Sequence, residues 1–172
     1  VGSGLRSSAG AIQKVSIAKD FSVKYETIGK NKPRGICGSG YIDILAEMLK
    51  SGLLDKDGKI KAIKHKRIRE TELGREFVVV FKEDSDSSSD IIITEADIDN
   101  LKRAKAAIYS ATCILCKHLS LNLEDAENIF IAGGFGNYLD IDDALAIGLL
   151  PPALRGKTRL AVNTAGMGAQ DC

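Results

Sequence analysis

The chain has 172 residues, of which 44% are apolar and only 5% aromatic, and its charges leave a net charge of +1. This length allows one domain, whose core must be aliphatic because tryptophan is absent. The balanced charge gives no electrostatic basis for binding nucleic acid or an anionic membrane. No apolar run approaches the ~20 residues that span a bilayer, and the start of the chain lacks the features of a signal peptide. We therefore expect a cytoplasmic protein.

The cysteines and histidines indicate no metal centre and no nucleophile. The cysteines are too few and too irregularly spaced for a disulfide framework and indicate reduced thiols. They are Cys37, Cys113, Cys116 and Cys172. Cys113 and Cys116 form one C-x-x-C in the middle of a predicted helix, without the second pair that a zinc site or an iron–sulfur cluster needs. Neither His65 nor His118 has a partner at catalytic spacing, so we assign no catalytic residue.

The first third of the chain predicts a hairpin followed by a helix. Residues 11–18 and 21–29 alternate apolar and polar side chains, which is typical of antiparallel strands. A glycine loop at residues 35–40 leads directly into a helix that Gly52 ends. Its apolar face comprises Ile42, Leu45, Ala46 and Leu49. Residues 59–70 are basic and show no clear period.

Two apolar runs, at residues 77–81 and 91–93, predict buried strands. The acidic, serine-rich residues 83–90 lie between them and predict a mobile loop without a metal site.

A long helix is predicted from Thr94, which forms a capping box with Asp97. Apolar residues recur at helical spacing along one face. They are Ile98, Leu101, Ala104, Ile108, Ala111, Leu115 and Leu119. We expect this helix to pack across a sheet through Leu101, Ile108 and Leu115.

The last third predicts a buried strand at residues 129–132, a short helix at 142–147 and a strand at 160–162. The order of elements favours an α/β fold in which one mixed sheet is covered by helices. A ribonuclease-H-like layer and a doubly wound fold both fit this order.

Three glycine-rich turns are candidate ligand sites. Residues 129–137 place glycines after a buried strand, at the sheet edge where open α/β folds bind ligands. Residues 35–40 open a helix, whose free N–H groups attract anions, and residues 163–169 follow the last strand. Neither a G-x-G-x-x-G nor a Walker lysine motif is present. Each turn also has a structural alternative, namely a backbone with positive φ or close packing of a helix on a sheet.

Taken together, the strings at residues 32–55, 93–111, 129–151 and 163–169 resemble one family. It comprises the ATP-dependent reductive activators of corrinoid-dependent methyl-transfer enzymes, in the superfamily of acetate and sugar kinases, heat-shock chaperones and actin. The resemblance implies a ribonuclease-H-like, actin-like ATPase fold, with residues 1–172 as the C-terminal lobe. Both ends of the chain are then expected to be cuts through a longer protein that carries an N-terminal lobe and an iron–sulfur domain.

The resemblance also implies a function and its residues. Such activators reduce inactive Co(II) corrinoid proteins to Co(I), an uphill step coupled to ATP hydrolysis. This lobe is expected to border the nucleoside of ATP, while the isolated chain is inactive. The nucleotide-binding residues implied are Gly133, Gly134, Phe135, Gly136, Asn137, Gly38, Ser39, Gly40 and Lys105. Val162 departs from the family pattern, which usually has glycine there.

The expected cofactors are ATP with Mg²⁺, and an iron–sulfur cluster outside this chain. The expected partners are a corrinoid protein or corrinoid-dependent methyltransferase and the N-terminal lobe, and a homodimer stays open. One alternative is another kinase-like ATPase, such as a 2-hydroxyacyl-CoA dehydratase activator, whose cluster cysteine could only be Cys37, in a glycine loop. The other alternative is an interaction module without catalysis.

Overall fold

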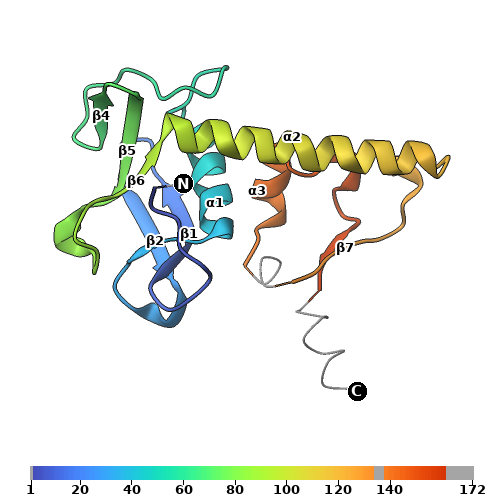
Figure 1. The fold of residues 1–172 in the computed structure, drawn as a ribbon, viewed down its shortest axis with the longest axis horizontal. Helices are drawn as coiled ribbons and strands as arrows, with labels where there is room; N and C mark the ends of the chain where they lie inside the picture. Colours follow the sequence, from blue (N-terminus) through green and yellow to red (C-terminus); the bar gives the residue numbers. More distant parts are fainter. Residues whose placement is uncertain (1, 134–137, 162–172) are drawn as a thin grey trace. The chain divides into compact units, whose positions relative to one another are not determined.

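The computed structural model describes residues 2–133 and 138–161. The chain divides into two compact units, Val1–Lys102 and Arg103–Cys172 (Figure 1).

The first unit begins with the predicted hairpin. Strand β1 (Ala11–Ile17) pairs antiparallel with β2 (Val23–Thr27) and parallel with the two-residue strand β3 (Gly35–Ile36), in the order β2-β1-β3. A 3-10 turn (Ile28–Lys30) follows β2. Helix α1 (Gly38–Lys50) lies along β1 (Figure 1). The hairpin and the helix are therefore confirmed, whereas β3 is too short to leave a periodic signal in the sequence.

Helix α1 approaches β1 closely at Gly40. A Cβ on Gly40 would overlap the carbonyl oxygen of Ile12 and lie 3.0 Å from Cγ2 of Ile36. Two carboxylates on α1 accept hydrogen bonds from β1 amides: Asp43 Oδ2 from Val15 N at 3.4 Å, and Glu47 Oε2 from Ile17 N at 2.9 Å. Because β3 ends opposite Ile12, these carboxylates satisfy strand amides that β3 does not reach.

A second sheet in this unit comprises β4 (Ile68–Thr71), β5 (Gly74–Val80) and β6 (Ile91–Thr94), antiparallel in the order β4-β5-β6. The prediction of one mixed sheet is therefore wrong. Each of these strands pairs with its neighbour along the chain, which leaves the hairpin of the first sheet to pair separately. Strand β4 begins at the end of the basic segment 59–70, and one half-buried residue, Ile68, followed by three exposed residues gives no alternation.

Ser3 connects the two sheets of the first unit. Its carbonyl oxygen accepts a hydrogen bond from Ile36 N of β3 at 2.8 Å. Its hydroxyl oxygen accepts another from Ile92 N of β6 at 3.1 Å. One residue near the start of the chain therefore bonds both β3 and β6.

The loop at residues 83–90 has anchored ends. A 3-10 turn (Lys82–Asp84) opens it, and Asp86 N donates to Pro33 O at 2.8 Å. Asp90 accepts a hydrogen bond from Lys82 N at 2.7 Å and pairs with Arg69 at 2.6 Å. The Lys82 bond first, and then Arg69, lower the pKa of the Asp90 carboxyl. The mobility predicted for this loop stays a prediction.

Helix α2 (Glu95–His118) is unbroken, as predicted, and begins with the predicted capping box. Thr94 Oγ1 accepts from Asp97 N, and Asp97 Oδ2 accepts from Thr94 N, both at 3.1 Å. The predicted packing is wrong, however, because Ile108 is 50% exposed and Leu115 is 60% exposed. The buried apolar residue of α2 is Ile98, in its first turns, and no strand among the described residues covers Ile108 or Leu115.

The second unit contains a two-stranded parallel sheet, β7 (Ile129–Ile131) with β8 (Thr158–Leu160), and helix α3 (Ile141–Ala146). Its described residues also form two 3-10 turns, Leu123–Asp125 and Pro152–Leu154. The predicted strand at residues 129–132 and helix at 142–147 are confirmed by β7 and α3. Strand β7 is less buried than predicted, because Phe130 is 65% exposed. Strand β8 ends at Leu160, where the strand predicted at residues 160–162 begins, so the predicted strand is displaced along the chain. Val162 lies outside the described residues.

The capping box generates a stability prediction. Thr94→Ala removes the hydroxyl that accepts from Asp97 N, and we expect the free energy of unfolding in urea to fall by about 1 kcal/mol. Thr94→Ser keeps the hydroxyl and should recover most of this loss. Equal unfolding midpoints for the alanine variant and the parent chain would contradict the role of the cap.

The close approach of α1 to β1 generates a second prediction. Gly40→Ala places a methyl group against the Ile12 carbonyl, and overpacking of this kind costs roughly 1–3 kcal/mol. We expect a lower thermal midpoint, although alanine favours helices more than glycine does. Gly2→Ala is the control, because an added Cβ there meets nothing within 4 Å. An unchanged or raised midpoint for Gly40→Ala would show that the backbone relaxes freely.

Candidate functional site

Gly133 lies two residues after the end of β7, at the carboxyl end of the strand. Its φ of 98° lies in the left-handed region, which favours glycine. An added Cβ would meet no atom within 4 Å among the described residues. The backbone conformation, and not close packing, therefore explains glycine at this position. The other predicted residues of the turn, Gly134, Phe135, Gly136 and Asn137, lie outside the described residues.

Gly38, Ser39 and Gly40 form the first turn of α1. The Cys37 thiol donates to Ile12 O and lies 3.1 Å from the Ser39 hydroxyl oxygen, and Ser39 is only 2% exposed. Ser39 therefore faces inward, and Gly40 has the packing role described above. Gly38 is exposed, and Cys37 at the N-cap makes no side-chain capping bond. Binding of a nucleotide by this turn stays a prediction.

Lys105 has a structural partner within the second unit. Its Nζ donates to the carbonyl oxygen of Ile147 at 2.6 Å, directly after α3. The neighbouring Gly148 has a φ of 71°, and an added Cβ there would lie 3.3 Å from the same Nζ. A cation at a helix C-terminus is favourable because the last carbonyl groups carry partial negative charge. A contact between Lys105 and a nucleoside stays a prediction. The ammonium has three N–H donors, so the bond to Ile147 leaves others for such a contact.

The cysteines of the described residues differ in access. Cys37 is fully buried, Cys116 is partly buried and Cys113 is exposed on α2, while Cys172 lies outside the described residues. Within residues 2–133 and 138–161, no group of three or more His, Cys, Asp or Glu side chains could hold a metal ion. The helices of the same residues include none long and apolar enough to cross a membrane.

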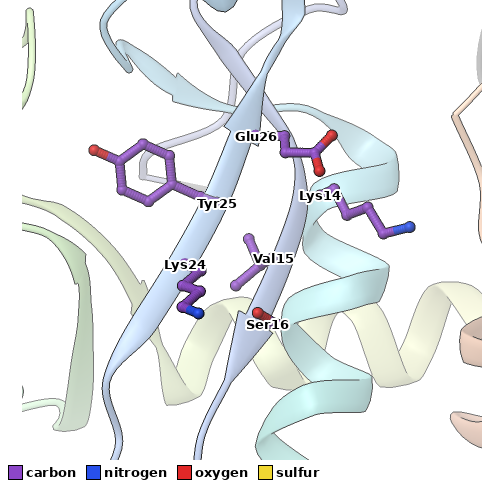
Figure 2. A pocket seen from close by; sticks show the side chains of 6 residues that line it. All are labelled: Lys14, Val15, Ser16, Lys24, Tyr25 and Glu26. Atoms are coloured by element: carbon purple, nitrogen blue, oxygen red, sulfur yellow. The ribbon is translucent and has the colours of Figure 1, made fainter.

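A surface hollow of about 280 Å³ lies on the β1–β2 hairpin (Figure 2). Three cross-strand pairs line it: Lys14 with Glu26, Val15 with Tyr25, and Ser16 with Lys24. Partial burial, and then the charge of Asp84, raise the pKa of Tyr25. Figure 2 shows Tyr25 and Glu26 pointing to opposite sides of β2, as successive strand residues do. Because these side chains include no nucleophile–base pair, the hollow supports no catalytic assignment.

Comparisons with known proteins give consistent results. The family model of the C-terminal domain of RACo, the ASKHA domain, matches residues 1–172. The corrinoid activation enzyme RamQ of Eubacterium limosum is 38% identical over 175 residues, which cover 97% of this chain and 29% of RamQ. The Co(II) methylated amine-specific corrinoid protein reductase of Methanosarcina barkeri is 31% identical over 117 residues, which cover 68% of this chain and 18% of the reductase.

A solved structure has the same fold. The reductive activator for corrinoid, iron-sulfur protein aligns with a TM-score of 0.89 at 46% identity, covering 97% of this chain and 27% of that protein. The chain thus spans less than a third of the length of these relatives. The predicted actin-like ATPase fold is confirmed, and the match over all 172 residues shows that the chain belongs to the family of RACo C-terminal domains, the ASKHA domain.

Proposed function

We propose that this chain is the C-terminal lobe of a longer ATP-dependent activator that reduces inactive Co(II) corrinoid proteins to Co(I). The observation that carries the proposal is the family match over residues 1–172. Two relatives support the substrate class, since one is named a corrinoid activation enzyme and the other a Co(II) corrinoid protein reductase. The partner is accordingly a corrinoid protein or a corrinoid-dependent methyltransferase.

The ASKHA domain type supports ATP as the energy source. Reduction of Co(II) to Co(I) is uphill, so a reductant alone is insufficient and ATP hydrolysis must be coupled to the electron transfer. The electron itself requires a redox group. The single C-x-x-C of this chain is too small a ligand set for an iron–sulfur cluster. We therefore assign the cluster, and the binding of Mg²⁺ with the phosphates of ATP, to other parts of the longer activator.

The role of this lobe in the proposal is to border adenine and ribose. Gly133 supports it, because it lies beyond the carboxyl end of a parallel strand, where α/β sheets bind ligands. An added Cβ there would meet no atom of the described residues within 4 Å. Gly134 to Asn137 would continue this turn along the nucleoside. Gly38 is a second candidate, because it is exposed at the first turn of α1, where N–H groups are free.

The rival enzyme class has less support. An activator of a 2-hydroxyacyl-CoA dehydratase needs an accessible cysteine to hold a cluster at its dimer interface. Cys37 is the cysteine in a glycine loop, but it is fully buried and its thiol donates to Ile12 O at 3.1 Å. This burial favours the corrinoid activator.

Substitution of Gly134 tests the nucleoside contact. In the full-length activator, Gly134→Val should lower ATP affinity at least tenfold, about 1.4 kcal/mol, because a side chain is added where backbone meets ligand. The thermal midpoint should stay near that of the parent protein. Affinity is measured by isothermal titration calorimetry.

Gly2→Val is the matched control, since an added Cβ at Gly2 meets nothing within 4 Å. Unchanged ATP affinity in Gly134→Val would refute the contact. A loss of ATP affinity in Gly134→Val that occurs only because the protein unfolds would also refute the contact. The 172-residue chain alone should bind ATP weakly, because the phosphate-binding motif lies outside it.

Reduction of cobalt tests the proposed activity directly. The full-length activator is mixed with a Co(II) corrinoid protein and a low-potential reductant that supplies one electron per cobalt. We expect Co(I), followed by visible absorbance, to form only with hydrolysable ATP, and the corrinoid protein to stimulate ATP hydrolysis. Equal rates of Co(I) formation with ATP and with a non-hydrolysable analogue would overturn the coupling.

A further inference from the structure

Strand β2 lies at an edge of its sheet. In the order β2-β1-β3, it has β1 as its one strand partner among the described residues. The outer side of an edge strand carries backbone N–H and C=O groups that can pair with another strand, unless proline, a bulge or charges protect it. The sequence of β2 is VKYET, which contains no proline and carries one charge of each sign. The irregularity of the hairpin falls in β1, between Ile12 and Lys14. The sequence of β2 therefore does not prevent pairing.

A hydrogen bond at the hairpin turn shows which β2 residues face the open edge. Ala18 N donates to Ser22 O at 3.0 Å, and the two residues continue the register of the hairpin. Bonded and non-bonded residues alternate along an antiparallel pair, so Lys24 and Glu26 also bond to β1. The backbone groups of the intervening residues then point away from β1. These residues are Val23, Tyr25 and Thr27.

The sequence of β2 is complementary to itself in an antiparallel pair centred on Tyr25. In that register, Lys24 of one copy lies opposite Glu26 of the other, and the reverse pair forms on the other side of the axis. Tyr25 lies opposite Tyr25 of the second copy, and Val23 lies opposite Thr27. Pairs of opposite charge and aromatic pairs across two strands are favourable. This register therefore uses all five residues and opposes no like charges.

The backbone agrees with the same register. The outward groups of Tyr25 would bond to Tyr25 of the second copy, and those of Val23 would bond to Thr27. Lys24 and Glu26, whose own backbone groups face β1, would form non-bonded pairs, in which opposite side chains lie closest. Both side chains are exposed, and they share one face of β2. The charged residues thus occupy the pairs in which side chains interact most directly.

We propose that β2 pairs with β2 of a second copy of the chain across a two-fold axis at Tyr25. The two three-stranded sheets then form one continuous sheet. A two-fold interface requires a surface that is complementary to itself, and the charges of β2 meet this requirement. A pair of five-residue strands is small beside the roughly 1,200 Å² that stable interfaces bury. We therefore expect a reversible dimer.

Strand β4, the outer strand of the second sheet, is poorly suited to such pairing. Opposite residues of an antiparallel pair have side chains on the same face, so the two-fold axis must pass through a residue and not between two. Centred on Arg69, the pair would place two arginines opposite each other, and centred on Glu70, two glutamates. Like charges directly opposite destabilise a strand pair. The charge pattern therefore favours β2 over β4.

Charge exchange in the full-length activator tests the register, with the dimer dissociation constant measured by sedimentation equilibrium. Lys24→Glu opposes two glutamates, and Glu26→Lys opposes two lysines. Each should raise the dissociation constant roughly tenfold or more. The double variant, Lys24→Glu with Glu26→Lys, restores both pairs of opposite charge and should recover the constant of the parent protein.

Lys32→Glu is the matched control, because Lys32 is exposed outside the strands and carries the same charge. It should leave the dissociation constant unchanged. Thermal midpoints of all variants are compared at low concentration, since Glu26→Lys also faces Lys14 within the hairpin. A parent protein that stays monomeric at its highest soluble concentration would overturn the proposal. Single variants that dimerise as the parent does, or a double variant without recovery, would also overturn it.

A cross-link locates the contact independently. Bonded residues of an antiparallel pair have Cα atoms about 5.5 Å apart, within the roughly 4.4–6.8 Å that a disulfide spans. Mild oxidation of Tyr25→Cys should therefore join two copies at position 25, as identified by mass spectrometry of the linked peptides. Lys32→Cys should give no such link, and equal linking of both variants would contradict the pairing.

The inference goes beyond the proposed function, because the paired strands involve neither the nucleotide nor the corrinoid protein. Both measurements are made without ATP and without cobalt. A failure of the dimer would therefore leave the activator function untouched, and a failure of cobalt reduction would leave the dimer untouched.

Discussion

The first unit depends on the close approach of α1 to β1 that Gly40 permits. Because Gly40 has no Cβ, the backbone of the helix lies against the Ile12 carbonyl. At this separation the carboxylates of Asp43 and Glu47 reach the β1 amides of Val15 and Ile17. A wider separation would leave those amides unpaired in the core, which costs more than a hydrogen bond contributes. The separation of α1 from β1, and with it the pairing of two strand amides, thus depends on the absence of a side chain at Gly40.

Gly40 and Gly133 are required for different physical reasons. Gly40 is required by packing, whereas Gly133 is required by its positive φ, and an added Cβ there would meet no described atom within 4 Å. A sequence shows the same letter in both cases. The positive φ is the structural alternative for Gly133, so ligand binding at Gly133 and at the exposed Gly38 stays a prediction. In the glycine loop at residues 35–40, Gly40 packs in the core, whereas Gly38 is exposed.

Local signals were predictable from the sequence, and pairings between distant segments were not. The β1–β2 hairpin and the Thr94 capping box involve neighbouring residues, so alternation and spacing identify them. The separation into two sheets depends on which strands pair, and short strands such as β3 and β4 carry no period. The apolar residues on α2 have the predicted helical spacing, but the predicted packing of Ile108 and Leu115 against a sheet is wrong, because both side chains are at least half exposed. The nucleotide residues rest on family resemblance, because glycine turns alone do not specify a ligand.

The two hydrogen bonds of Ser3 have a consequence for synthesis and folding. Ser3 bonds to Ile92, a residue 89 positions later. Closing so long a loop costs chain entropy before any contact compensates for it, so this step is slow compared with formation of the hairpin. A ribosome adds roughly 5–20 residues per second, so Ile92 is synthesised on the order of 4–18 s after Ser3. During that interval the Ser3 hydroxyl is without its bond to β6, so Ser3 cannot connect the two sheets until the second one has been synthesised.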